Sequence, residues 1–297
     1  MKSRTRSIKK ALPKPLKRVI RSTIRTFAVR TAERRVLPDF LIIGAKRGGT
    51  TSLWNWLVRH PHVEPMFPAA QQIKSPHYFD IHYDQGLNWY RSHFPTQEAL
   101  LALEKRMGIR PLCGEASPYY LFHPLAAERA HAVVPEAKII VSLRNPVDRA
   151  YSNYHERLGS GVEVLPTFED AIAAEHSRLA GTDALVRTGA YSPEHDSHSY
   201  LARGHYADQL TPWLTHYDRA NILILRLEDF KTDEAGEYRR VQEFLGLPIE
   251  PAPPTPRHNR LPVPPMNPET RSRLLELYAD SNAKLEQLLG RPFNWNT

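Results

Sequence analysis

The most constraining feature of this sequence is an apolar run that leads into a glycine-rich loop and then into a helical pattern. Residues 39–43 (DFLII) favour a buried parallel strand, and residues 51–59 (TSLWNWLVR) favour a helix. Glycines between them allow backbone N–H groups to converge on one anion, and the helix N-terminus adds partial positive charge. A glycine-rich turn without a ligand is the alternative, but it does not account for the cations and hydroxyls of the loop. The residues expected to hold the anion are Lys46, Arg47, Gly48, Gly49, Thr50, Thr51 and Ser52.

The rest of the chain alternates strand-like and helical segments. Further buried strands are expected at residues 111–114, 138–143 and 221–227. Helical patterns lie between them, at residues 96–107, 124–134, 147–158, 167–179, 200–217 and 235–245. After an extended proline-rich loop at residues 249–268, Asn267 and Pro268 open a last helix. This alternation predicts an α/β, three-layer, P-loop-like fold with a central parallel sheet flanked by helices.

Charge divides the chain into two parts. Residues 1–35 contain thirteen Lys and Arg and one acid, a net of +12, so the remainder carries −4 of the total of +8. We therefore expect a basic, partly amphipathic N-terminal tail at residues 1–36, a single domain at residues 37–297, and no nucleic acid partner. Apolar residues at helical spacing in residues 16–30 suit peripheral contact with an anionic membrane surface. A disordered basic tail and a transit peptide are the alternatives.

Composition also bears on the compartment. Cys113 is the only cysteine, which excludes an internal disulfide and a cysteine-based zinc site and fits a reducing compartment. No run of eighteen apolar residues occurs, and the start lacks the apolar core of a secretory signal. We expect a cytoplasmic protein whose tail could lie against the inner face of a membrane.

The loop departs from a nucleoside triphosphate site in two ways. Gly44 and Gly49 have the spacing of a Walker A motif, yet Thr50 stands where that motif needs lysine. The strand at residues 138–143 is followed by Arg144 rather than by an acid that could hold Mg²⁺. A transferring sulfuryl group carries less charge than a phosphoryl group, so cations and backbone donors suffice for it. The pattern therefore favours sulfuryl transfer without a metal, with a P-loop kinase or NTPase as the alternative.

With these motifs the sequence resembles the PAPS-dependent sulfotransferases (PAPS is 3′-phosphoadenosine 5′-phosphosulfate) over residues 38–296. It is particularly similar to the heparan-sulfate-type and related bacterial carbohydrate sulfotransferases. The resemblance implies that the glycine-rich loop binds the 5′-phosphosulfate of PAPS. It further implies that Arg47 takes the position of a basic residue, most often lysine, that assists the leaving phosphate. The product would be 3′,5′-phosphoadenosine phosphate (PAP), and no metal would be required.

A second segment, residues 142–155 (SLRNPVDRAYSNYH), resembles the element with which this family binds the 3′-phosphate. The resemblance implies that Arg144 and Ser152 are its two direct ligands. The alternative is an arginine that pairs only with Asp148. Near the C-terminus, residues 257–260 (RHNR) resemble a basic loop that closes over the nucleotide, which makes Arg260 a further candidate.

On the acceptor side, the attacking hydroxyl must lose a proton, so a base should lie near it. In residues 74–80 (KSPHYFD), many relatives have a catalytic glutamate where Ser75 stands. Serine cannot accept a proton at neutral pH, so we predict His77 as the base. Asp80 would orient His77 or substitute for it.

Glu115, in residues 114–121 (GEASPYYL), is the second candidate base or a ligand for a substrate hydroxyl. A strand-end partner for a nearby arginine is the alternative. Heparan-sulfate-type relatives have lysine where Ala116 stands, which argues against a heparan-sulfate-specific assignment. Residues 194–198 (EHDSH) contain metal-ligand residue types, but their spacing matches no standard ligand set, so no metal is expected.

Together these features predict a sulfotransferase that transfers a sulfuryl group from PAPS to a hydroxyl or amino group of an acceptor, a carbohydrate or glycolipid. The catalytic residues would be His77, Arg47, Glu115 and Asp80. Because Ser75 and Ala116 replace two expected catalytic side chains, a non-catalytic, membrane-associated nucleotide-binding module is a further alternative.

Overall fold

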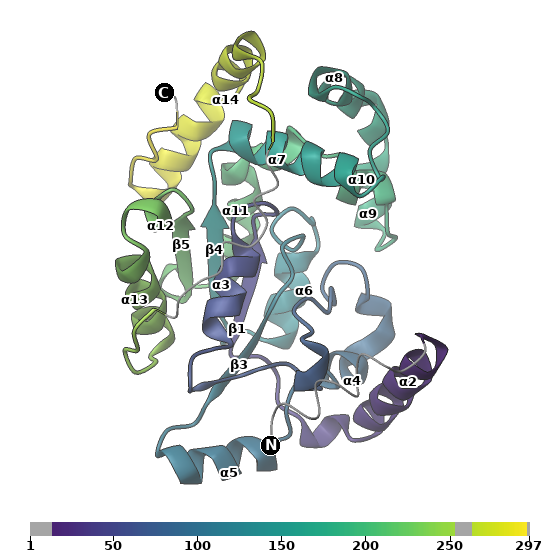
Figure 1. Ribbon diagram of the computed structural model, residues 1–297, viewed down its shortest axis with the longest axis vertical. Coiled ribbons are helices and arrows are strands. Elements are labelled where there is room, and N and C mark those ends of the chain that lie inside the picture. Colours follow the sequence, from purple (N-terminus) through teal and green to yellow (C-terminus); the bar gives the residue numbers. More distant parts are fainter. Residues whose placement is uncertain (1–13, 253–262, 296–297) are drawn as a thin grey trace.

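The computed structural model describes residues 14–252 and 263–295, and its centre is a parallel sheet of five strands (Figure 1). Every residue of β1, Phe40–Gly44, is buried, as expected for a strand covered on both faces. The strand order is β2-β3-β1-β4-β5, so the loops that follow β3, β1 and β4 meet at one edge. The other strands are β2 Val63–Glu64, β3 Leu112–Ala116, β4 Lys138–Leu143 and β5 Ile222–Arg226.

Helices cover both faces of the sheet. α3, Thr50–Leu57, lies in front of the strands in Figure 1, and α6, Ala126–Val133, lies behind them with α11, Tyr206–His216. The predicted three-layer α/β fold is therefore confirmed. Further helices are α4 Gly86–Arg91, α5 Gln97–Met107, α7 Pro146–Gly159, α8 Phe168–Leu179, α9 Thr182–Arg187, α10 Pro193–Ser197, α12 Asp229–Thr232, α13 Glu234–Leu245 and α14 Pro268–Leu289.

The predicted elements differ from the structure mainly at their ends. The helix expected from residue 200 begins only at Tyr206, because residues 202–204 form a separate 3-10 turn. The two-residue strand β2 and the short helices α4, α9, α10 and α12 were not predicted, since such short segments show no periodicity. The start of α14 is as predicted: the Asn267 side chain accepts the backbone N–H of Glu269 at 2.8 Å, and Pro268 follows it.

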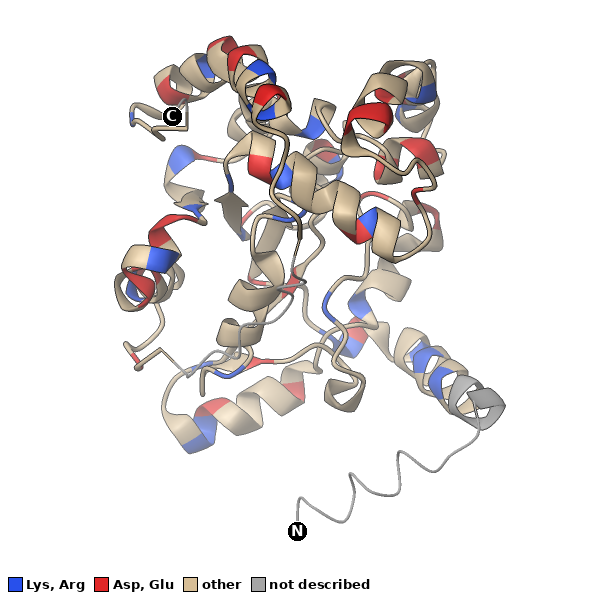
Figure 2. Cartoon of the chain, turned by 45° about the horizontal axis from the view of Figure 1, so that its top comes forward, with Lys and Arg blue, Asp and Glu red and all other residues tan. Residues whose placement is uncertain are grey.

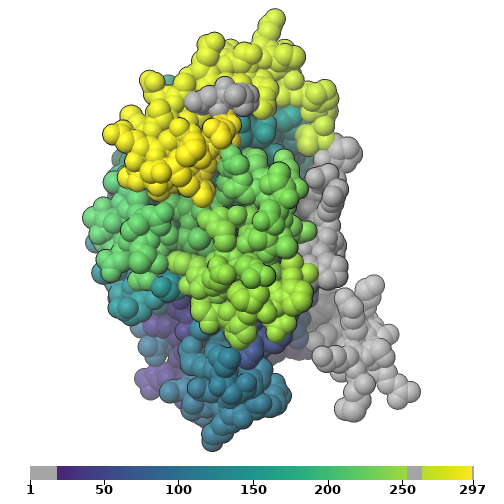
Figure 3. All heavy atoms as spheres, turned by 90° about the vertical axis from the view of Figure 1, so that its left-hand side faces the viewer, coloured from purple at the N-terminus to yellow at the C-terminus, as the bar shows by residue number. Residues whose placement is uncertain are grey.

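A second apolar cluster holds α7 and α8 beside the carboxyl edge of the sheet. It contains Tyr154 and Phe168 from α7 and α8, Tyr200 from the segment before α11, and Tyr278 from α14, all almost fully buried. Figure 3 shows α14, in yellow, at the top of the domain, directly above the green residues that precede it in the sequence. This cluster of apolar residues fixes α7 and α8 next to the loops that follow β1 and β4.

α2, Lys14–Arg30, lies at the edge of the domain next to α4 (Figure 1). Arg25 Nη1 donates to the backbone oxygen of Ser92 at 2.6 Å, and Ala28 is fully buried. The opposite face is exposed, with Val19 and Phe27 each 60% accessible, and Figure 2 shows basic residues along the helix. Among the residues that the structure describes, no helix has both the length and the apolar character needed to cross a membrane.

Candidate active site

The glycine-rich loop between β1 and α3 packs against the end of β4. Ser142 Oγ donates to the backbone oxygen of Gly48 at 2.6 Å. A Cβ atom at Gly48 would lie 2.2 Å from the backbone oxygen of Ser142, so no other residue fits there without a shift of the backbone. Gly49 has a φ of 88° and precedes the first turn of α3, where a left-handed residue is required. Thr50, Thr51 and Ser52 form that first turn.

The two predicted halves of the nucleotide site meet at this loop. Arg47 Nε donates to Ser152 Oγ of α7 at 3.0 Å, and the N–H of Ala45 donates to the backbone oxygen of Ser142 at 2.8 Å. Both contacts arise because β1 and β4 are neighbours in the sheet. Segments about a hundred residues apart in the sequence therefore form one surface.

Arginines gather around Arg47. Burial is the main reason why the pKa of Arg47 is lowered. The charges of Arg144, Arg149 and Arg157 lower it further, and the charge of Glu156 opposes the shift. Arg144 follows β4 directly and lies within this cluster. Mutual repulsion of this kind disappears when an anion binds. The surroundings of Arg47 therefore favour an anionic ligand.

One buried arginine near the loop has guanidinium nitrogens available for such a ligand. Arg149 Nη2 donates to the backbone oxygen of Tyr200, but its Nε and Nη1 have no hydrogen-bond partner among the described residues. The guanidinium group of Arg203, which is also buried, pairs with Asp196 and lies over the rings of Tyr119 and Phe122. Both side chains are at most 3% accessible. Buried, unpaired donors such as those of Arg149 are costly unless a ligand meets them, so the residues present fit a polyanionic nucleotide such as PAPS.

Lys46 faces a different partner from its neighbour Arg47. Its Nζ lies 3.1 Å from Oδ1 and 3.2 Å from the backbone oxygen of Asp196 in α10. Burial and the charge of Arg203 together lower the pKa of Lys46 to about 7, against the effect of Asp196. The sequence predicted Lys46 as a ligand of the donor, and this stays a prediction; in the structure its ammonium group pairs with the carboxylate of Asp196.

Lys74 was not predicted as a site residue, although it begins the segment that contains His77. Its Nζ donates to Thr51 Oγ1 at 3.0 Å, so its ammonium group lies against the first turn of α3. Burial lowers the pKa of Lys74 to about 8. The one signal in the sequence that could have suggested this lysine is its place at the start of the segment expected to contain the base. Arg260 lies outside the described residues.

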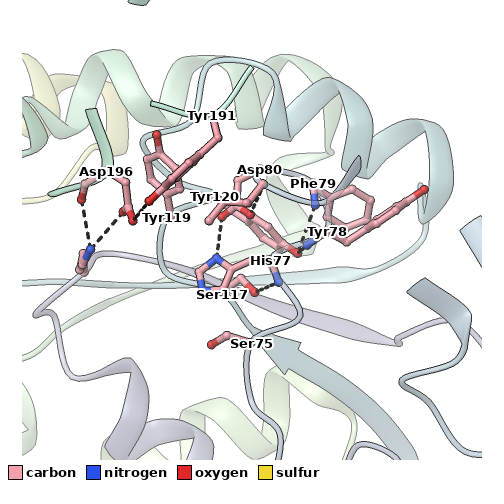
Figure 4. A network of polar contacts seen from close by, with 12 residues as sticks. Ser75, His77, Tyr78, Phe79, Asp80, Ser117, Tyr119, Tyr120, Tyr191 and Asp196 are labelled. Carbon is pink, nitrogen blue, oxygen red and sulfur yellow. Dashed lines mark hydrogen bonds and ion pairs between the residues drawn. The ribbon is translucent and has the colours of Figure 1, made fainter. Parts of the chain in front are cut away.

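The predicted base, His77, lies beside its predicted partner (Figure 4). His77 Nδ1 and Asp80 Oδ2 are 2.9 Å apart, and the His77 side chain is 30% accessible whereas Asp80 is fully buried. Burial tends to lower the pKa of His77, but the hydrogen bond and the charge of Asp80 outweigh it, so the pKa of His77 is raised. Because Asp80 occupies Nδ1, Nε2 is the ring nitrogen left to accept a proton.

Glu115, the second candidate base, is fully buried. Its carboxylate accepts three hydroxyl hydrogen bonds: from Tyr90 and Tyr120 to Oε1, both at 2.8 Å, and from Ser117 to Oε2 at 2.6 Å. Burial raises the pKa of Glu115 to about 7, although these hydrogen bonds oppose the shift. Its partners are hydroxyls rather than the arginine considered above, and Ser75 Oγ donates to the neighbouring Ala116 backbone oxygen.

Residues 194–198, which contain metal-ligand residue types, are engaged with other groups. Asp196 contacts Lys46 and Arg203, and His198 Nδ1 pairs with Glu194. Within residues 14–252 and 263–295, no group of three or more His, Cys, Asp and Glu side chains is arranged to hold a metal ion.

The central parallel sheet and the glycine-rich loop after β1 define a P-loop-like α/β domain. The chain belongs to the sulfotransferase family, because residues 37–278 match the family model described as "Sulfotransferase domain". The predicted family and the predicted class of enzyme, a sulfotransferase, are thus confirmed.

Individual relatives support the same assignment. Human heparan sulfate glucosamine 3-O-sulfotransferase 6 is 36% identical over 72% of this chain and 54% of its own length. Human bifunctional heparan sulfate N-deacetylase/N-sulfotransferase 2 is 31% identical over 71% of this chain and 22% of its own length. A sulfotransferase crystal structure from Alicyclobacillus acidocaldarius is 30% identical, with a TM-score of 0.66 over 88% of this chain and 100% of that one. The chain spans about half the length of the 3-O-sulfotransferase that it matches.

Proposed function

We propose that this protein transfers a sulfuryl group from PAPS to a hydroxyl or amino group of a carbohydrate, with a glycolipid as a related acceptor. The observation that carries the proposal is the contact between Arg47 and Ser152, which joins the loop expected to hold the 5′-phosphosulfate to the helix expected to hold the 3′-phosphate. Two of the relatives are named for sulfation of an oxygen or a nitrogen of heparan sulfate, which supports a sugar acceptor here.

The donor would be held at both of its phosphate-bearing ends. The backbone N–H groups of the glycine-rich loop and the hydroxyls of Thr50, Thr51 and Ser52 would bind the 5′ end. Arg144 and Ser152 would bind the 3′-phosphate, which distinguishes PAPS from ATP. When bound, PAPS supplies a sulfuryl group already activated by its bond to phosphate. PAP would be the nucleotide product, and the proposal needs no metal ion.

The glycine-rich loop would act on the leaving group, and the His77 turn would act on the attacking acceptor. Arg47 would stabilise the negative charge that develops on the departing phosphate. His77 Nε2 would accept the proton of the acceptor hydroxyl, while Asp80 holds Nδ1 and fixes the ring. Transfer would be direct and in line, without a covalent enzyme intermediate.

Turnover of radiolabelled PAPS with a panel of glycans tests this function. Transfer of label to a glycan supports it. Tight binding of PAP without transfer to any acceptor would favour the non-catalytic nucleotide-binding module. A P-loop kinase is disfavoured by membership of the sulfotransferase family. It would regain support only if ATP hydrolysis with Mg²⁺ were found and sulfuryl transfer were not.

The substitution Arg144→Ala is expected to remove selectivity for the 3′-phosphate. The ratio of affinities for PAP and for adenosine 5′-phosphate should fall by about 10- to 100-fold, because a charge-assisted hydrogen bond contributes roughly 1.5–3 kcal/mol. Calorimetric titration with both nucleotides measures the ratio. Arg187→Ala, in an exposed pair with Asp183, is the matched control and should leave the ratio unchanged. An unaltered ratio in Arg144→Ala would remove this arginine from the site.

We further propose that the basic tail makes peripheral contact with the anionic inner face of a membrane, which would place the protein in the cytoplasm. Residues 1–35 carry a net charge of +12, and Val19, Ile20 and Phe27 of α2 are exposed.

Phe27→Glu is expected to reduce sedimentation with phosphatidylserine vesicles by several-fold, because it places a negative charge on the exposed face of α2. Leu277→Glu, an equally drastic change at an exposed site of α14, should have no effect. Equal sedimentation of both variants, or none by the unmutated protein, would contradict the membrane proposal.

A further inference from the structure

One buried carboxylate fastens the whole turn that carries His77. We propose that Glu115 is a positioning residue rather than a second base: through Ser117 and Tyr120 it fixes the backbone of residues 77–79 and thereby aims the His77 ring. This inference rests on the proposed function, in which His77 accepts the proton of the acceptor.

The connection runs through two hydroxyl groups. Ser117 Oγ donates to Glu115 Oε2 at 2.6 Å and accepts the backbone N–H of His77 at 3.2 Å. Tyr120 donates its hydroxyl to Glu115 Oε1 at 2.8 Å and accepts the N–H of Tyr78 at 2.9 Å and of Phe79 at 3.3 Å. Three consecutive amides are therefore held by hydroxyls whose own hydrogens point to one carboxylate. A hydroxyl can accept and donate at once, so Glu115 sets the direction of both.

The turn needs such support because of its backbone conformation. His77 has a φ of 53°, a left-handed value that is disfavoured for any residue with a side chain. Strained residues persist only where their surroundings determine them, and they concentrate at functional sites. The backbone oxygen of His77 accepts the N–H groups of Ile81 at 3.1 Å and His82 at 2.9 Å, which closes the other side of the turn.

The position of Glu115 explains why it does not serve as the base itself. Glu115 is a residue of β3 whose side chain is fully buried, and both of its carboxylate oxygens already accept hydrogen bonds. A proton taken from an acceptor would have to displace one of these donors. His77, by contrast, is 30% accessible and has Nε2 free of Asp80.

A matched pair of tyrosine variants tests the inference. Tyr90 and Tyr120 both donate to Glu115 Oε1 at 2.8 Å and both are buried, but only Tyr120 accepts amides of the His77 turn. We expect Tyr120→Phe to lower kcat by about 10- to 100-fold, with the KM for PAPS and for the acceptor changed less than about twofold, because small displacements of a reacting group cost this much. Tyr90→Phe should keep kcat within about twofold of the unmutated value. Equal loss of kcat in both variants would overturn the inference.

Amide hydrogen exchange provides a readout that does not depend on activity. The N–H groups of Tyr78 and Phe79 should exchange at least about tenfold faster in Tyr120→Phe than in the unmutated protein, and at the unmutated rate in Tyr90→Phe. Unchanged exchange in Tyr120→Phe would sink the inference even if the unmutated protein transferred no sulfuryl group. Lack of all transfer with the predicted exchange pattern would instead reject the proposed function alone.

Substitutions of Glu115 distinguish positioning from base catalysis. Glu115→Gln keeps an acceptor oxygen for the tyrosines, so it should retain at least about tenfold more activity than Glu115→Ala. It should also keep the rise of kcat/KM with pH that is expected when His77 loses its proton. If Glu115 were the base, both variants would be equally inactive and this rise would be absent.

Discussion

His77→Ala is expected to lower kcat by about 10²- to 10⁴-fold, the usual contribution of a general base, while the affinity for PAP changes less than about twofold. The imidazole is the accessible member of the His77–Asp80 pair, and Asp80 at 2.9 Å leaves only Nε2 to accept the proton of the acceptor. Single-turnover transfer from radiolabelled PAPS measures the chemical step, and calorimetry measures binding of the nucleotide.

His176→Ala, at an exposed position of α8, is the control and should behave as the unmutated protein. If His77→Ala retained its turnover, the base would have to be reassigned, first to Glu115. In that event the positioning role proposed for Glu115 would also be wrong, and the tyrosine variants would show it independently.

The pH dependence provides a second test of His77. As the pH rises, kcat/KM should rise, whereas the stability of the folded protein should fall. The pKa of His77 in the folded protein is raised above the ordinary value of 6.5 by Asp80, against the effect of burial. Stabilisation by the His77–Asp80 pair is therefore complete below 6.5 and is lost as the pH rises through the folded pKa. Base catalysis requires the neutral imidazole, so kcat/KM should rise through the same pH range. This rise should be absent in His77→Ala.

Arg47→Ala is expected to lower kcat by about 10²- to 10³-fold, as is usual when a group that stabilises developing charge is removed. Arg47 lies where the glycine-rich loop meets α7 and donates from Nε to Ser152. Arg47→Lys should stay within about tenfold of the unmutated kcat, because the positive charge is kept. Arg187→Ala, which removes the exposed pair with Asp183, is again the control.

Steady-state kinetics with saturating PAPS would measure these variants, and circular dichroism would verify their fold. An Arg47→Ala variant with undiminished kcat would show that the leaving phosphate is stabilised elsewhere. Lys74, whose ammonium group contacts Thr51, would then be the next residue to replace.

Much of the arrangement around the glycine-rich loop could be predicted because its signals are local, and nucleotide binding there stays a prediction. A buried run, three glycines and a helix are adjacent in the sequence, and the order of β1 and β4 in a parallel sheet then brings Arg47 to Ser152. The His77–Asp80 contact was also predictable, since the two residues are three positions apart.

The contacts that could not be predicted from the sequence are tertiary ones. Lys46 and Asp196 are 150 positions apart, and no local pattern indicates that they pair. The same holds for Glu115, for which an arginine partner was the alternative to its predicted role: packing brings the hydroxyl of Tyr90 from α4 to its carboxylate instead. Burial decides such pairings, and burial is a property of the assembled fold.

The central claim is that two adjacent strand ends hold the two phosphate-bearing ends of one adenosine nucleotide. Titration calorimetry of the unmutated protein with PAP and with adenosine 5′-phosphate, both in the presence of EDTA, tests it directly. We predict that PAP binds in the chelator and that its affinity exceeds that of adenosine 5′-phosphate by about 10- to 100-fold. Equal affinity for the two nucleotides, no heat with PAP, or binding that requires a divalent metal would contradict the account.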